Sequence, residues 1–485
     1  MRQRTLALVF LILFLIGQLI TLFPFSSHEL MRFYACLLIA GSLIPLSYRL
    51  LTSPYRLISC HSAVLFAPVW FLYLEAVFSN GDVWNLPPEP AIVALSYSAL
   101  FLFLYNCLYA FSMPSDLIRF HDKRFLRGLN PSTLAIFALL FTFILLLAIL
   151  AYNDFDITRA VESYLGGRST GSGGLIKRSG LGGSEVFLQP LTFISPVVPT
   201  VAALSWVRFG ERRIPPFYLR VFATLSAVFI VFLIFLGGSR GNLAEYLAGP
   251  LAIWLIFGRR LPLPVFFASS LLSFLLLVGI WQFQVNTRSN LLDSIDSFAE
   301  ITSFNPAETH RDNNLYLFTL NVMYMPEPYP FDGYSELGYL IVNPIPRFLW
   351  PEKPKGIQES ASSFSTAVGP YARGPILIGT ASLSSTVVSD GYKMQHVIGI
   401  FVYALIFAYL SSAWDSLGQV RLSRSNLYFI LNAAWAFWLL WGFRSGFALV
   451  SGMYTVWGAY LFGGIISLMP RKRKAAVQLS HSSSS

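Results

Sequence analysis

Arginines flanked by glycine are the side chains in this sequence best suited to chemistry. Arg240 lies in the string G-G-S-R-G-N at residues 237–242, and Arg444 lies in G-F-R-S-G at residues 442–446. A guanidinium keeps its charge at any working pH and donates two parallel N–H groups to phosphate oxygens, and glycine lets a ligand approach the backbone closely. Arg240 could therefore hold a lipid diphosphate. A helix-end arginine that reaches to lipid headgroups is the alternative.

Three titratable side chains compete for the role of general base. Glu245 follows Arg240 by about one helical turn, so it could take a proton or simply pair with that arginine. Asp390 precedes an apolar stretch, and His310 lies in a long polar segment. A histidine titrates near neutral pH, which suits proton transfer.

No divalent-metal motif is visible in the sequence. Asp293, Asp296 and Glu300 are spaced for one face of a helix, but such spacing is more typical of a solvated acidic face than of a metal site. We expect neither a metal nor another cofactor. The three cysteines all fall in apolar stretches, which argues against a disulfide framework: Cys36, Cys60 and Cys107.

The composition places these residues in a membrane protein. The chain has 485 residues, of which 55% are hydrophobic and only 12% are charged, and its mean hydropathy is +0.60. Soluble domains carry roughly 25% charged residues, and disordered chains are poor in apolar residues. The net charge of +10 does not indicate nucleic acid, because Lys and Arg lie beside the apolar stretches. The expected partner is the lipid bilayer.

The candidate residues must then be positioned by helices, because a backbone in lipid can satisfy its hydrogen bonds only within a helix or a closed barrel. Each span needs roughly 20 apolar residues, and twelve stretches qualify. The expected fold is an all-α polytopic membrane protein with about 12 transmembrane helices. Its predicted spans are 5–23, 32–48, 57–78, 91–112, 133–152, 186–207, 217–236, 242–258, 261–282, 394–412, 427–443 and 447–469.

The distribution of charge predicts the orientation. With twelve spans, one side carries 20 of the 34 Lys and Arg residues but only four of the 24 acidic residues. The positive-inside rule makes that side cytoplasmic, with both termini on it. The first span resembles a signal peptide, but its length and the lack of an Ala-x-Ala cleavage site favour a retained helix.

Four regions follow from this plan. Residues 1–282 hold helices one to nine, 283–393 form a large external loop between helices nine and ten, 394–470 hold the last three helices, and 471–485 form a basic, serine-rich cytoplasmic tail. Inside the loop, apolar residues recur at helical spacing, which predicts an amphipathic helix either on the outer leaflet or in a core of the loop: Leu315, Phe318, Val322 and Met325.

One string in the loop carries a resemblance to a known family. Residues 343–354 read N-P-I-P-R-F-L-W-P-E-K-P, and G-S-R-G precedes them between two spans at 238–241. Together these strings resemble the Wzy-type O-antigen polymerases, bacterial polymerases of oligosaccharide repeat units. Residues 389–392 and 396–399 match that family's acidic, aromatic and N-F-G pattern at membrane re-entry, with Asp390 for the usual Glu and His396-Val397 for Asn-Phe.

The resemblance implies a GT-C-like glycosyltransferase on the outer face of the bacterial inner membrane. Its donor would be an oligosaccharide on undecaprenyl diphosphate, its acceptor a second lipid-linked repeat unit, and a chain-length regulator a further partner. Arg240 and Arg347 would stabilise the leaving diphosphate, with Arg288, Arg311 and Arg444 as second choices. An interfacial anchor is the alternative role for Arg347, which lies beside Trp350.

Two other functions remain open. A ligase of the same architecture would pass a finished glycan to lipid A core, and the sequence does not reveal the acceptor. A flippase for lipid-linked sugars would also fit twelve helices, but transporters place charges near the midplane, whereas Glu75 and Glu245 fall near the outer ends of their spans.

Overall fold

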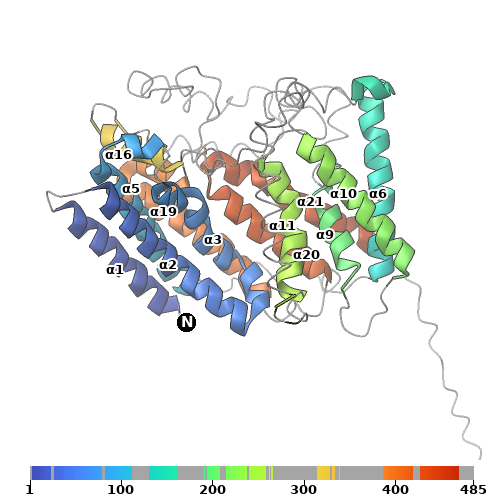
Figure 1. The fold of residues 1–485 in the computed structure, drawn as a ribbon, viewed down its shortest axis with the longest axis horizontal. Coiled ribbons are helices and arrows are strands. Elements are labelled where there is room, and N and C mark those ends of the chain that lie inside the picture. Colours follow the sequence, from blue (N-terminus) through green and yellow to red (C-terminus); the bar gives the residue numbers. More distant parts are fainter. Residues whose placement is uncertain are drawn as a thin grey trace, which may run out of the picture.

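The protein is a bundle of helices, seen here in a computed structural model (Figure 1). The structure describes residues 3–22, 27–78, 82–111, 130–160, 191, 194–207, 215–236, 240–257, 262, 264–265, 314–327, 330–331, 333, 338, 386–418 and 426–468. Within these ranges every regular element is a helix and no strand occurs. The all-α prediction is therefore confirmed for the described part of the chain.

The N-terminal helices are continuous and closely packed. They are α1 (Gln3–Thr21), α2 (His28–Thr52), α3 (Cys60–Pro68), α4 (Leu74–Val77) and α5 (Pro88–Phe111). A π-helical segment, Val69–Tyr73, joins α3 to α4, and two 3-10 segments, Pro54–Ile58 and Asp82–Asn85, precede α3 and α5. Helix α5 packs against α1 and against α19, a helix from the C-terminal part of the chain.

Of the remaining helices, α16 and α19 lie beside α5 in Figure 1, and the others form the opposite side of the bundle. In chain order, the remaining helices are α6 (Pro131–Tyr152), α9 (Val197–Leu204), α10 (Phe217–Leu236), α11 (Arg240–Phe257), α16 (Asn314–Tyr324), α19 (Val387–Gly418), α20 (Asn426–Gly442) and α21 (Gly446–Leu468). Helix α20 lies centrally, because it contacts α3, α11 and α21. Contacts of α20 with α3 and α19 join the two sides.

In the described part of the chain, eight helices are long and apolar enough to cross a membrane, as expected of a polytopic membrane protein. They coincide with eight of the predicted spans, and the shorter α20 and α11 coincide with two more. Helix α9 covers part of the span predicted at 186–207, and nearly all of the span predicted at 261–282 lies outside the described residues.

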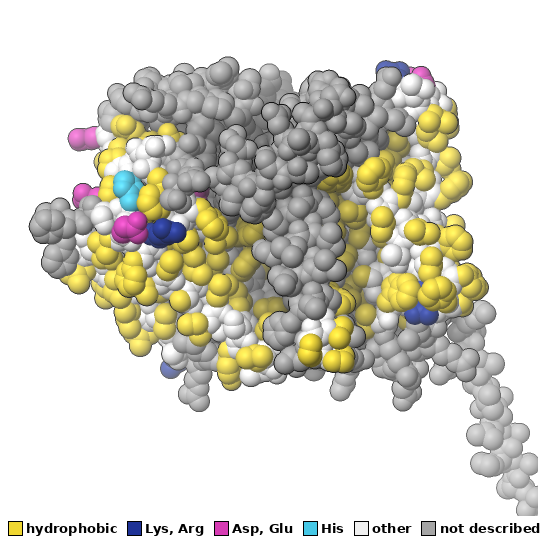
Figure 2. Space-filling view, viewed as in Figure 1, with side chains coloured by type: hydrophobic (Ala, Val, Ile, Leu, Met, Phe, Trp, Pro, Cys, Tyr) yellow, Lys and Arg dark blue, Asp and Glu magenta, His cyan; other side chains and the backbone are white. Residues whose placement is uncertain are grey.

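Apolar side chains on the outer surface match a lipid environment. On α1, Leu8, Ile12, Leu15 and Leu19 are each about half exposed, whereas Phe10 is fully buried. Figure 2 shows hydrophobic side chains over much of the described part of this face, with only a few charged side chains among them. A helix with an exposed apolar face is stable only where lipid replaces water.

For α16 the sequence left two placements open, on the outer leaflet or buried in a core of the loop, and the structure shows a buried helix that packs against the bundle. Residues 314–321 are all buried, and α16 packs against the membrane helices α5 and α19. The apolar repeat therefore marks a helix inserted into one end of the bundle. Sequence periodicity could not distinguish these placements, because both require an apolar face.

Candidate functional site

The candidate site lies at one end of the bundle, where α4 ends, α16 packs, and α19 and α21 begin. We call this the α16 end. At the opposite end, Asp415 near the C-terminus of α19 binds Cys60 and His61 at the start of α3. We call that the Asp415 end.

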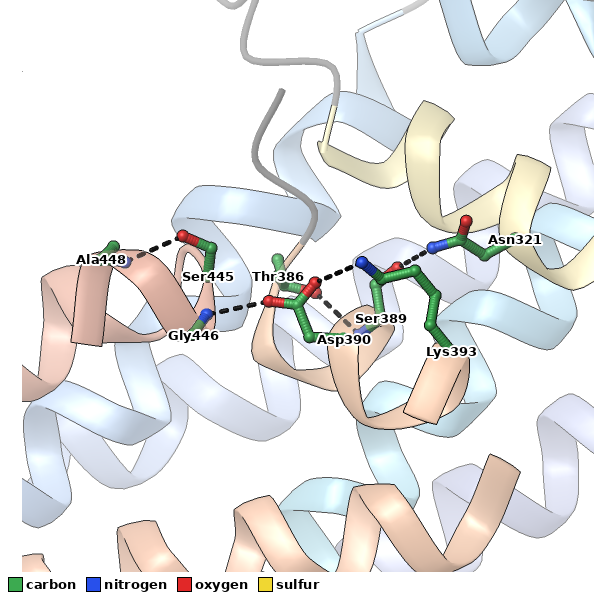
Figure 3. Close-up of polar contacts among 8 residues, drawn as sticks. All are labelled: Asn321, Thr386, Ser389, Asp390, Lys393, Ser445, Gly446 and Ala448. Atoms are coloured by element: carbon green, nitrogen blue, oxygen red, sulfur yellow. Dashed lines mark hydrogen bonds and ion pairs between the residues drawn. The ribbon is translucent and has the colours of Figure 1, made fainter. Parts of the chain in front are cut away.

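Asp390 occupies the centre of the α16 end (Figure 3). The residue is 3% exposed. One carboxylate oxygen accepts a hydrogen bond of 2.8 Å from the Gly446 N–H, and the other lies 3.3 Å from Nζ of Lys393. Gly446 is the first residue of α21, so the negative charge sits at the positive end of that helix dipole.

The turn between α20 and α21 is fixed on both sides of Arg444. The Val387 N–H donates to the Phe443 carbonyl at 2.9 Å, just before Arg444, and Asp390 binds the Gly446 N–H just after it. The Ser445 hydroxyl accepts from the Ala448 N–H at 3.0 Å and caps α21. The half-buried guanidinium of Arg444 lies 5.1 Å from the centre of the Trp441 ring.

Helix α16 is attached to the same end by two polar contacts. Glu75, the second residue of α4, accepts from the N–H groups of Leu315 and Tyr316 at 2.8 and 2.9 Å. The Asn321 side-chain amide donates to the Ser389 hydroxyl at 2.6 Å. These contacts hold a segment of the predicted external loop against α4 and α19.

Helix α11 brings two further candidates to this region. Arg240 is its first residue, and the structure describes the place of Arg240 in the helix but not its side chain. Glu245, one turn later, accepts a hydrogen bond from the Thr455 hydroxyl of α21. Glu245 lies five residues into α11 and Thr455 nine residues into α21, and Figure 1 shows both helices beginning at the α16 end.

Helix α19 is broken close to the site. Gln395 and His396 leave the helical conformation, and His396 has a φ of 56°. The fold at the break brings Gly391 and Gly399 into contact, since a Cβ on Gly399 would lie 2.0 Å from the Gly391 carbonyl oxygen. The Tyr97 hydroxyl lies 2.7 Å from Nε2 of His396. Only glycine at both positions permits this approach.

The structure thus brings Asp390 and Arg444 together and places Arg240 and Glu245 on a helix that begins at the same end. The other predicted site residues lie outside the described residues, and so do the three spaced carboxylates: Arg288, His310, Arg311 and Arg347, with Asp293, Asp296 and Glu300.

Sequence reasoning missed Lys393, Asn321 and Ser389. The signal for Lys393 is its spacing of three from Asp390, which places both side chains on one face of a helix. Nothing local pointed to Asn321, because its partner lies 68 residues away in the sequence.

A second polar cluster fills the Asp415 end. Asp415 is 3% exposed and accepts from the N–H groups of Cys60 and His61, each at 2.9 Å, and from the Tyr109 hydroxyl at 3.0 Å. Nε2 of His61 donates to the side-chain oxygen Oδ1 of Asn106. Nδ1 of His61 therefore accepts a hydrogen bond from the guanidinium of Arg49. Every partner here belongs to the bundle itself, which makes this cluster an anchor between helices.

Among the described residues no group of three or more His, Cys, Asp or Glu side chains could hold a metal ion. Fold and site together define the class: an all-α protein with several helices able to cross a membrane and with buried polar clusters at both ends of the bundle. Comparisons with protein-family models, curated proteins and solved structures match nothing to this chain.

Proposed function

We propose that the chain is a membrane glycosyltransferase that joins oligosaccharide repeat units carried on undecaprenyl diphosphate, on the outer face of the bacterial inner membrane. The observation that carries the proposal is the convergence at the α16 end. Arg240, Asp390 and Arg444 belong to segments about 150 and 54 residues apart in the sequence, and all three segments begin helices at this end. Two of them belong to the strings that resemble Wzy-type polymerases.

The proposed reaction needs little more than positioning and charge. A hydroxyl of the acceptor sugar attacks the anomeric carbon of the donor glycan, the bond from that carbon to the diphosphate oxygen breaks, and the lipid diphosphate leaves. Fixed guanidiniums stabilise the leaving group better in a partly dehydrated site than in water. Arg240 and Arg444 are suited to this role, with Arg347, Arg288 and Arg311 as further candidates in the predicted loop.

The acceptor's proton goes to a base that Glu245 or His310 would supply. Asp390 is less suited, because both of its carboxylate oxygens are already engaged with Lys393 and Gly446. Burial with two partners favours a role in holding the helix ends together.

The first test is a deletion of the gene followed by electrophoresis of the cell's surface polysaccharide. A polymerase predicts glycan capped with a single repeat unit. Bare acceptor with long lipid-linked chains would indicate the ligase, and intermediates trapped on the cytoplasmic face would indicate the flippase.

The second test asks whether arginine geometry matters. We expect Arg240→Lys and Arg444→Lys each to lower polymer length or yield by roughly tenfold or more at normal protein level, because an ammonium cannot make the bidentate contact. Arg220→Lys is the matched control, since Arg220 also lies over an aromatic ring, 4.5 Å from the centre of Trp206, but at the Asp415 end. Full activity in both Arg240→Ala and Arg444→Ala would end the assignment.

A further inference from the structure

Polar contacts join three helices at the α16 end. Asn321 of α16 donates to Ser389 of α19, and the next residue of α19, Asp390, pairs with Lys393 and accepts from Gly446 of α21 (Figure 3). The side chains of Lys393 and Asp390 are only 12% and 4% exposed. A charged pair so deeply buried is costly to desolvate, and such pairs can be retained where they fix a geometry.

The two carboxylate oxygens of Asp390 face different helices. One faces Lys393 on its own helix, and the other faces the first N–H of α21. The ammonium group of Lys393 neutralises the carboxylate of Asp390 and binds its Oδ1. This contact orients the carboxylate so that Oδ2 faces the N–H of Gly446. Lys393 therefore acts on α21 through Asp390.

Arg444 lies between two backbone groups that α19 holds. The Phe443 carbonyl is bound by the Val387 N–H, and the Gly446 N–H is bound by Asp390. We infer that Asp390 and Lys393 form a positioning pair that fixes the turn 443–446 and so sets the place of Arg444 relative to the substrate diphosphate. This inference rests on the proposed function for its last step, whereas the ordering of the turn does not depend on it.

A positioning role and a general-base role of Asp390 predict different activities for the variant Asp390→Asn. Asp390→Asn keeps a side-chain oxygen that can accept from Gly446, but it can no longer take up a proton at neutral pH. Positioning predicts that Asp390→Asn retains much more activity than Asp390→Ala. A base predicts that both are equally inactive.

The first experiment measures the turn directly, by hydrogen exchange of peptides covering 443–449 in the purified full-length protein in lipid nanodiscs. We expect Asp390→Ala to speed exchange at Gly446 by about tenfold or more, and Asp390→Asn to speed it less, because only the alanine removes the acceptor. Asp154→Ala is the control, since Asp154 forms an exposed pair with Arg159. Unchanged exchange in Asp390→Ala would overturn the inference.

The second experiment measures elongation of lipid-linked repeat units isolated from the deletion strain. We expect Lys393→Gln to raise the KM for the donor by several-fold and Lys393→Arg to restore it, because arginine keeps the charge. The losses in Asp390→Ala and Arg444→Ala should not multiply in the double variant, since both act through one guanidinium.

Losses that multiply fully, or equal inactivity of Asp390→Asn and Asp390→Ala with normal exchange, would overturn positioning. If exchange at Gly446 changes in the Asp390 variants as expected, but the wild-type protein never elongates the repeat units, the proposed function is refuted. The inference that Asp390 orders the turn would then still stand.

Discussion

The three buried carboxylates of the described structure each cap the beginning of a helix. Asp390, Glu75 and Asp415 are each 3% exposed, and each accepts backbone N–H bonds at the beginning of another helix, namely α21, α16 and α3. A carboxylate taken out of water needs donors and positive potential, and the first turn of a helix offers both. The same contact also supplies N–H groups with partners that lipid cannot provide.

Asp415 gives the clearest prediction at the scale of a residue. Asp415→Ala leaves two buried N–H groups and the hydroxyl of half-buried Tyr109 without their acceptor, so we expect the free energy of unfolding to fall by about 3 kcal/mol or more. Asp415→Asn should cost less, because its side-chain oxygen can still accept one of the bonds. Thermal unfolding in detergent measures both, with exposed Asp154→Ala as the control. Equal melting temperatures for all three would refute the capping role.

At the scale of the helix, the break in α19 is the most unusual element. A non-glycine residue at positive φ is strained, and His396 stays there because the Gly391–Gly399 contact and the Tyr97 hydroxyl hold the fold around it. The part of α19 before the break carries Asp390 and Lys393. The break therefore lets one helix both pack along α5 and place its first turns beside α16 and α21.

Gly399→Ala tests the break. The new methyl would meet backbone atoms that cannot rotate away, so we expect destabilisation by about 3 kcal/mol, at the upper end for overpacking. Gly464→Ala is the matched control, because nothing lies within 4 Å of its Cβ position, and it should change stability by less than about 1 kcal/mol. Denaturant or thermal unfolding measures the stability of the two variants. Equal stabilities would show that the contact between Gly391 and Gly399 is not needed for the fold.

At the scale of the whole molecule, the two ends of the bundle should face opposite sides of the membrane. In Figure 1, α6 ends at the top and the link from α2 to α3 lies at the bottom. Asp154 follows α6, Arg56 belongs to the 3-10 segment before α3, and both residues are exposed. The charge distribution predicts that the end with Asp154 faces outward.

Cysteine labelling of intact cells tests this orientation. In a variant without the three native cysteines, Asp154→Cys should react with a membrane-impermeant maleimide, and Arg56→Cys should react only after permeabilisation. The reverse pattern would place the α16 end in the cytoplasm and exclude an outer-face reaction.

The sequence by itself determined the class of fold and the positions of most helices. Apolar stretches of about 20 residues have few alternatives in lipid, so 5–23 or 133–152 could be recognised as helices without any knowledge of their neighbours. It also singled out Arg240, Asp390 and Arg444, because glycine flanks and charge beside apolar stretches are local features.

Only the tertiary structure decided how these parts meet. Glu75 and the start of α16 are 240 residues apart, and Asp390 and Gly446 are 56 apart. The sequence therefore left Asp390 as a candidate base, whereas the structure shows its two oxygens engaged with Lys393 and α21. Likewise, the apolar repeat of α16 could not reveal that the helix packs against both α5 and α19. Local pattern fixes which residues become helical because each helix satisfies its own backbone, but which carboxylate caps which helix depends on packing between distant segments.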